Sequence, residues 1–370
     1  MALAFTVYFG LLILLLAHSA LVHGKKFTPA AWLAVSLGPI LLMALVLGFR
    51  YDVGMDYMMY AQHFDNIGRY LNDEETYEPV YELINIILGR AGAPLPLLFM
   101  VTVGLETAFF YMAFEDKQEM LPFAVLFYFI TGQIFYDLNI VRHAIATMIF
   151  IWSLRYLDSG EFWKYLLGIA FASCFHIAAS VLILVWFLRS PKRLFIDRPS
   201  IVVILFIITL IIGPIVTKTL FDPMKDVFEV LGYKNYIYLV EDWEMDISSG
   251  MGMYLHKALD LVTILLGLKF AGQIGSKSFN AALRTFIIGA WLANIFGLNM
   301  LLSRIPFSLT SLRILILPVI AANVLKDREN GKFTLEMGIM AGVMIIYLVL
   351  FVADIAGGAS KCSPFQFYSL

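Results

Sequence analysis

The sequence predicts an all-α polytopic membrane protein of about 10–12 transmembrane segments, on the evidence of its composition and its long apolar runs. Of its 370 residues, 61% are hydrophobic and only 15% are charged, and the mean hydropathy is +0.82. A soluble protein has about a quarter of its residues charged, so a soluble fold of this size would lack the polar surface to cover itself. Since a bilayer core takes about 20 apolar residues per helix, runs of that length predict membrane-spanning helices. The runs that qualify are 2–22, 30–48, 95–114, 121–136, 140–157, 163–188, 200–217, 256–273, 284–302, 310–325 and 335–355.

Charge and cysteine content exclude several classes of function. The net charge is −2 and no dense block of Lys and Arg occurs, which argues against a nucleic-acid partner. The two cysteines, Cys174 and Cys362, form neither a disulfide framework nor a Cys-x-x-Cys metal or redox site. No phosphate-binding Gly-rich loop, His-Glu-x-x-His or Gly-x-Ser-x-Gly motif is present. We therefore expect no cofactor.

The distribution of Lys and Arg predicts which face of the membrane each loop occupies. The linker 23–29 carries two lysines, which places it in the cytoplasm and the N-terminus outside. The loop 50–95 carries three positive and eight negative residues, which suits the outer face. A second acidic loop lies near 218–255. No internal repeat is evident, so we expect a single transmembrane domain, residues 1–370, with these two outer loops.

The run 163–188 is predicted to enter the membrane and return as two half-membrane segments. It is long enough for one spanning helix, but a single crossing would give 12 Lys and Arg inside against 14 outside. A re-entrant pair, 163–174 and 176–188, reverses this to 15 inside and 11 outside, as the positive-inside rule requires. We therefore place a hinge near His176.

Cationic residues gather at the predicted outer ends of the spans, where an ionisable group near the membrane usually has a function. They are Arg50 at the end of the second run, Arg142 and His143 at the start of the fifth, His176 at the hinge, and Arg304 and Arg313 on either side of the turn 305–308. Several guanidinium groups around one recess suit a phosphate or pyrophosphate, whose oxygens match the arginine fork. The alternatives are snorkelling to the interface for the arginines and a core position for the hinge histidine.

Carboxylates and tyrosines lie in the first predicted outer loop. Asp56 and Tyr60 are four residues apart, so on a helix they share one face. Glu78 precedes a proline that suits the first turn of a helix. A carboxylate at that point can accept a proton from a hydroxyl group, although it can equally complement the helix dipole. Four tyrosines can stack on sugar rings or belong to an interfacial aromatic belt: Tyr57, Tyr60, Tyr77 and Tyr81.

Taken in order, these motifs resemble those of the EpsG family, the Wzy-type bacterial polysaccharide polymerases. The matching elements are Arg50…Gly54-x-Asp56-Tyr57-x-x-Tyr60, Tyr77-Glu78-Pro79-x-Tyr81, Arg142-x-x-Ile145-Ala146, Ala172-x-x-Phe175-His176-x-Ala178-Ala179 and a late Arg304. The resemblance covers about residues 45–190 and continues weakly to about 320. Val80, where the family often has glycine, and His143, where glutamine is common, depart from the pattern without removing a proposed charge.

The resemblance implies a membrane-embedded glycosyltransferase of GT-C-like architecture. Such polymerases take a glycan chain from an undecaprenyl pyrophosphate carrier and pass it to the next lipid-linked repeat unit. They work at the outer side of the bacterial inner membrane, so donor, acceptor and membrane lipid are the implied partners, with a chain-length regulator protein as a further one. The implied catalytic residues are Asp56, Glu78, Arg142 and His176, and the implied substrate-binding residues are Arg50, Tyr57, Tyr60, Tyr81, His143, Arg304 and Arg313.

We expect a single inverting displacement without a metal ion. Arg142 and Arg304, together with His176, would stabilise the departing pyrophosphate, and Asp56 or Glu78 would deprotonate the acceptor hydroxyl. Metal independence is expected because the first outer loop contains no Asp-x-Asp motif. Two alternatives stay open: a ligase of similar architecture that passes the chain to another acceptor, and a flippase or exporter of lipid-linked sugars. An exporter should show repeated halves and charges spread through its spans, and this sequence shows neither pattern. The EpsG-type motifs favour the polymerase over the ligase.

Overall fold

The computed structural model is built from helices, with no β-strand among the residues that it describes: 1–69, 77–230, 250–297, 302–326 and 333–369. Its helices group into two compact units. The first unit consists of residues 1–186 and 317–370, and the second, 187–316, is an insertion between them. The sequence analysis predicts a single domain, so this division is a feature that hydropathy does not indicate.

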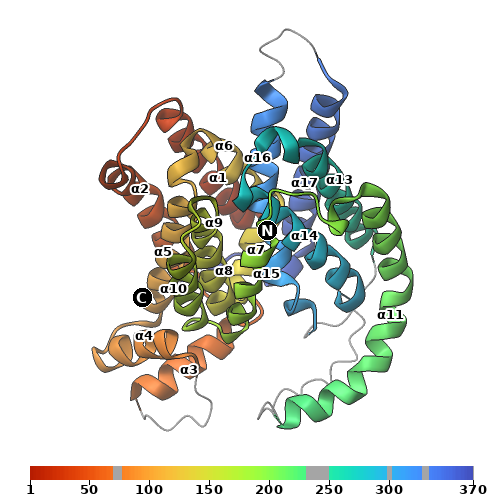
Figure 1. The fold of residues 1–370 in the computed structure, drawn as a ribbon. Helices are drawn as coiled ribbons and strands as arrows, with labels where there is room; N and C mark the ends of the chain where they lie inside the picture. The colour runs from red at the N-terminus through yellow and green to blue at the C-terminus, as the bar shows by residue number, and fades with distance from the viewer. Residues whose placement is uncertain (70–76, 231–249, 298–301, 327–332, 370) are drawn as a thin grey trace. The chain divides into compact units, whose positions relative to one another are not determined.

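The first unit contains most of the helices (Figure 1). They are α1 (Ala2–Val22), α2 (Pro29–Gly48), α3 (Tyr57–Arg69), α4 (Pro79–Arg90), α5 (Leu95–Ala113), α6 (Leu121–Ile130), α7 (Gln133–Asn139), α8 (Val141–Ser153), α9 (Arg155–Ser159), α10 (Phe162–Ser173) and α17 (Leu335–Gly357), with 3₁₀ segments at Glu115–Met120 and Ala359–Lys361. Helix α5 lies at the centre, packed against α2 and α8. Trp32 donates a hydrogen bond from Nε1 to the carbonyl of Tyr111 (2.9 Å), which ties α2 to α5 with both side chains buried.

The second unit is built around α11 (Pro199–Val230), α13 (Met251–Ile274) and α14 (Lys277–Phe296). It also holds α15 (Phe307–Thr310) and the start of α16 (Arg313–Lys326), together with 3₁₀ segments at Phe195–Asp197 and Leu302–Arg304. Arg284 of α14 is buried and donates to both carboxylate oxygens of Asp197, at 2.8 and 2.6 Å. Its other donors bind the carbonyls of Leu188, Ser190 and Lys192 (2.6, 2.6 and 2.9 Å). One buried arginine therefore holds the basic linker 189–198 against α14.

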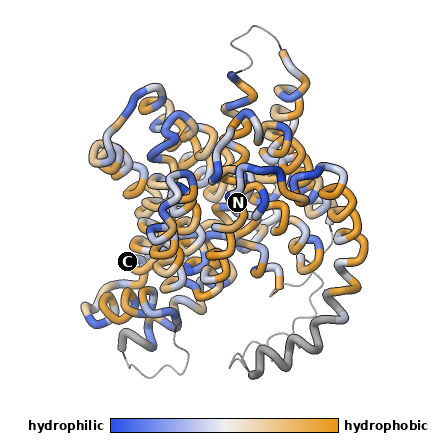
Figure 2. Tube along the Cα trace, viewed as in Figure 1, coloured by the Kyte–Doolittle hydropathy of each residue, from blue (hydrophilic) through white to orange (hydrophobic). Residues whose placement is uncertain are grey.

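Seven helices of the described chain are long and apolar enough to cross a membrane. They are α1, α2, α5, α13, α14, the stretch Phe307–Lys326 and α17. Figure 2 shows apolar residues along these helices and polar residues at many of the connections between them. Glu115–Ile130 and Gln133–Asn139 are together apolar and long enough for one further span, which is bent by 64° at the break between α6 and α7. Gly132, at φ +75°, lies in this break, where a left-handed backbone ends the helix. The all-helical polytopic fold is confirmed.

The predicted hinge near His176 is a break between two helical segments. Helix α10 ends at Ser173, and a 3₁₀ segment, Ile177–Leu188, begins three residues after Cys174. Tyr165 donates its hydroxyl to the carbonyl of Leu182 (2.5 Å), which holds the two segments together. The return of these segments to one face of the membrane stays a prediction. The predicted outer loop near 218–255 begins within α11, and residues 231–249 lie outside the described chain.

Candidate active site

A largely buried ion pair joins the start of α4 to the start of α8. Glu78 is the N-cap residue of α4, with Pro79 in the first helical position, and Arg142 is the second residue of α8. Nη1 of Arg142 pairs with Oε2 of Glu78, and the two side chains are only 12% and 14% exposed. The structure therefore brings together two predicted catalytic residues that lie 64 positions apart in the chain.

The helix break carries a third predicted catalytic residue to the same place. The other carboxylate oxygen of Glu78, Oε1, accepts a hydrogen bond from the backbone N–H of Ile177 (3.0 Å). It also lies 3.8 Å from Nδ1 of His176. Because that Nδ1 accepts the backbone N–H of Ala178 (3.2 Å), the neutral imidazole carries its proton on Nε2. The ring of His143 lies 4.4 Å from the ring of His176, so both predicted histidines adjoin the ion pair.

Tyrosine rings form one wall of this site. The Arg142 guanidinium carbon lies 3.9 Å from the ring centroid of Tyr77 and 5.9 Å from that of Tyr81, so both rings can stabilise the cation. Tyr60 contacts both rings at centroid distances of 6.2 and 5.8 Å. Tyr60 and Tyr81 are buried, and burial raises the pKa of Tyr81 well above its ordinary value. Tyr60 and Tyr81 are therefore buried rings that pack against Tyr77 and each other, and Tyr77 is the partly exposed ring of the three.

One donor of the central arginine is unused. Nε of Arg142 is buried and has no hydrogen-bond partner among the residues that the structure describes. Buried donors in proteins are almost always satisfied, so an unpaired one on a cation points to a missing acceptor. An anionic oxygen is the acceptor that a guanidinium prefers.

A second acid–base pair adjoins the first and is absent from the residues that the sequence predicts. Nε2 of His63, on α3, lies 2.7 Å from Oε2 of Glu82, on α4. The His63 ring lies 4.0 Å from the ring of Tyr77. The spacing places each residue on the helix face of a predicted site residue: Glu82 is four residues after Glu78, and His63 is seven after Asp56. Neither spacing shows that α3 and α4 pack on each other.

Arg50, a predicted substrate-binding residue, faces the interior instead. Its side chain is fully buried and donates to the carbonyls of Leu47 (2.8 Å), Val53 (3.2 Å) and Leu138 (3.4 Å). Its guanidinium carbon lies 4.4 Å from the ring centroid of Phe99. Burial lowers the pKa of Arg50 to about 10, so it stays charged at neutral pH. Since its donors already bind backbone carbonyls, we assign it a structural role.

Tyr57 lies beside this buried arginine, and Asp56 precedes it at the start of α3. Asp56 is 9% exposed and its carbonyl accepts the backbone N–H of Tyr60 (3.1 Å). Tyr57 is fully buried and stacks on Phe99 with ring centroids 4.7 Å apart. Burial raises the pKa of Tyr57 to about 12. Tyr57 is therefore a packing residue.

The two remaining predicted residues, Arg304 and Arg313, belong to the second unit. Arg304 ends the 3₁₀ segment Leu302–Arg304. Arg313 begins α16, where its Nη2 lies 3.5 Å from Oδ1 of Asp260 and its Nε donates to the carbonyl of Thr310 (3.0 Å). Asp260 is a buried acid on α13 that the sequence analysis does not single out.

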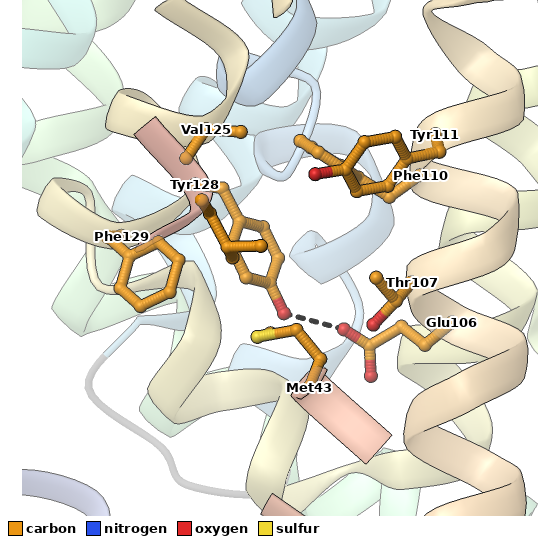
Figure 3. Close-up of a pocket in the computed structure, with 9 residues that line it drawn as sticks. Met43, Glu106, Thr107, Phe110, Tyr111, Val125, Tyr128 and Phe129 are labelled. Carbon is orange, nitrogen blue, oxygen red and sulfur yellow. Dashed lines mark hydrogen bonds between the residues drawn. The ribbon is translucent and has the colours of Figure 1, made fainter. Parts of the chain in front are cut away.

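A separate polar group lies deep in the first unit (Figure 3). Glu106 of α5 is 5% exposed and accepts a hydrogen bond from the Tyr128 hydroxyl (2.7 Å). The small cavity beside it has about 10 Å³ open to the centre of a water molecule, which is room for about one water. Among the described residues no three His, Cys, Asp or Glu side chains are grouped as a metal site would require, and metal independence stays a prediction.

Comparison with known proteins identifies the family. The family model described as "EpsG family" matches residues 34–367, which is nearly the whole chain and includes both units. No curated protein and no solved structure matches this sequence. The match extends the resemblance seen in the motifs around Glu78, Arg142 and His176 to the rest of the sequence. This chain belongs to the EpsG family.

Proposed function

We propose that this protein is a membrane glycosyltransferase that polymerises lipid-linked oligosaccharide repeat units. The proposed carrier is undecaprenyl pyrophosphate, and the proposed place of reaction is the outer face of the bacterial inner membrane. Membership of the EpsG family supports a polymerase-like role. The observation that carries the site assignment is the buried Glu78–Arg142 pair, with a buried unused donor on the arginine, at a break between two helical segments.

Arg142 is the proposed ligand of the departing pyrophosphate. Its free Nε can donate to a phosphate oxygen while the guanidinium is held over Tyr77. Negative charge grows on the pyrophosphate as the glycosidic bond breaks. A fixed cation at that place therefore stabilises the transition state more than the bound substrate and lowers the barrier. The His176 side chain, 27% exposed and 3.8 Å from Glu78, is the proposed second ligand at this site.

Glu78 is the proposed general base. In the resting protein its carboxylate is paired with Arg142. A pyrophosphate that binds Arg142 shares that cation and releases the carboxylate to meet the acceptor hydroxyl. The acceptor hydroxyl then gives its proton to Glu78, its oxygen bonds to the anomeric carbon, and the bond from that carbon to the pyrophosphate oxygen breaks with inversion. This step needs no metal ion, and the role of Arg304, which belongs to the second unit, stays a prediction.

The proposal is tested by product size in vitro, with purified protein and lipid-linked repeat units. We expect wild type to give a ladder of polymers, and Arg142→Ala and Glu78→Ala to give none. Glu115→Gln is the matched control, because Glu115 pairs with Arg155 (2.6 Å) in the same unit at 18% exposure of both side chains. Full activity of both site variants would refute the site. A single transfer to a different acceptor would indicate a ligase, and movement of unchanged carrier between leaflets would indicate an exporter.

A further inference from the structure

Two carboxylates one helical turn apart, at the start of α4, are each paired with a basic side chain from another helix. Glu78 pairs with Arg142 of α8, and Glu82 pairs with His63 of α3. Helices α3 and α4 pack on each other as a hairpin, which Figure 1 shows below α5. The second pair is therefore built into the same element that presents Glu78.

Tyr77 contacts both bases. Its ring centroid lies 3.9 Å from the guanidinium carbon of Arg142 and 4.0 Å from the centroid of the His63 ring. The planes of the Tyr77 and His63 rings are inclined by 40°. A displacement of the imidazole therefore moves the ring on which the guanidinium rests.

The His63 imidazole lies deeper than either side chain of the Glu78–Arg142 pair. The His63 side chain is 5% exposed and the Glu82 side chain 13%, and their shortest contact is a 2.7 Å hydrogen bond. Burying such a pair costs desolvation energy that its mutual attraction only partly offsets, so it adds little to stability. Buried pairs of this kind instead hold neighbouring groups in one arrangement.

We propose that His63 and Glu82 are positioning residues of the transferase site, which hold the Tyr77 ring and through it the Arg142 guanidinium. The inference rests on the proposed function for its kinetic consequence, but not for its geometry. Glu82 fixes the orientation of the imidazole, the imidazole fixes the Tyr77 ring, and the ring limits where the guanidinium can lie. Misplacement of a group that acts in the transition state lowers kcat more than it raises KM.

The kinetic test compares Glu82→Gln, which keeps a hydrogen-bond acceptor for His63, with Glu82→Leu, which removes it. We expect Glu82→Gln to stay within about threefold of wild type, and Glu82→Leu to lose about tenfold or more in kcat with KM for the lipid-linked unit changed less than about twofold. In an Arg142→Lys background the same Glu82→Leu change should lower kcat by less than about twofold relative to Arg142→Lys alone, because its effect passes through Arg142. His18→Phe is the control: His18, on α1, hydrogen-bonds the carbonyl of Val35 (3.0 Å) and, like His63, contacts a tyrosine ring.

A second test is independent of activity. Modification of arginines by phenylglyoxal, mapped by mass spectrometry, reports whether Arg142 is still held. We expect Glu82→Leu to raise the modification rate of Arg142 about threefold or more while that of Arg155, ion-paired elsewhere in the unit, does not change. If wild type makes no polymer but this change is seen, the proposed function fails and the positioning role stands. Unchanged Arg142 reactivity in Glu82→Leu, or an equal kcat loss in both backgrounds, would overturn the inference.

Discussion

Replacing Glu78 by glutamine separates the chemistry of this residue from its structural contacts. The single amide oxygen can still accept a donor of Arg142, the amide nitrogen then faces the N–H of Ile177, and the side chain can no longer take a proton. Positioned general bases contribute about 10²–10⁴-fold, so we expect activity to fall by at least about 10²-fold.

The stability cost of this substitution follows from the burial of the pair. Breaking a fully buried ion pair costs about 3–5 kcal/mol. The two side chains here are 12% and 14% exposed, and the amide keeps a hydrogen bond to the arginine, so about 2 kcal/mol is expected. The protein should therefore remain folded and bound to lipid-linked donor.

The assay measures initial rates of linkage formation together with thermal unfolding of the same preparations. Glu115→Gln, which weakens the Arg155 pair of the same unit, should lose comparable stability and keep its activity. A Glu78→Gln protein that polymerises within about threefold of wild type would refute the assignment of Glu78 as the base. The reasoning would then turn to Asp56, which is buried at the start of α3.

The buried arginines Arg284 and Arg50, the reaction itself and Tyr57 each allow a further test. Arg284→Met should lower the free energy of unfolding by about 3 kcal/mol or more in a denaturation experiment, because it leaves the Asp197 carboxylate and three carbonyls without their donors. Arg50→Lys should cost about 2 kcal/mol in the same assay, since one ammonium cannot reproduce the forked contacts to Leu47, Val53 and Leu138. Polymerisation should continue in EDTA, and a loss of activity that manganese or magnesium restores would contradict metal independence. Burial raises the pKa of Tyr57 from about 10 to about 12, so the unfolded chain releases the hydroxyl proton at lower pH than the folded protein does. The free energy of unfolding should therefore fall as pH rises from about 10 to about 12. It should fall less steeply in Tyr57→Phe.

The parts of the account that the sequence predicts well are those that depend on local pattern. The apolar runs show a polytopic helical protein because a bilayer demands that length of apolar helix. Two segments on either side of His176 are expected because a single crossing of 163–188 would put more Lys and Arg outside than inside, and the helix does break there. Glu78 is recognisable as a helix start from the following proline.

The parts that the sequence misses depend on contacts between distant segments. Arg50 looks like a residue at the end of a span, but a carbonyl 88 residues away and the ring of Phe99 enclose it. His63 and Glu82 meet only because α3 and α4 pack as a hairpin. The bend at Gly132 comes from its left-handed backbone, which an apolar run does not reveal.

The central claim is that this chain transfers glycan from one lipid pyrophosphate carrier to the next repeat unit. The most direct test counts the carrier pyrophosphate released by purified wild-type protein against the linkages formed, both by mass spectrometry of the reaction. The account predicts one free carrier pyrophosphate per linkage, with a single carrier left on each polymer. Lipid-linked units that cross the bilayer unchanged, without any release of carrier pyrophosphate, would contradict it.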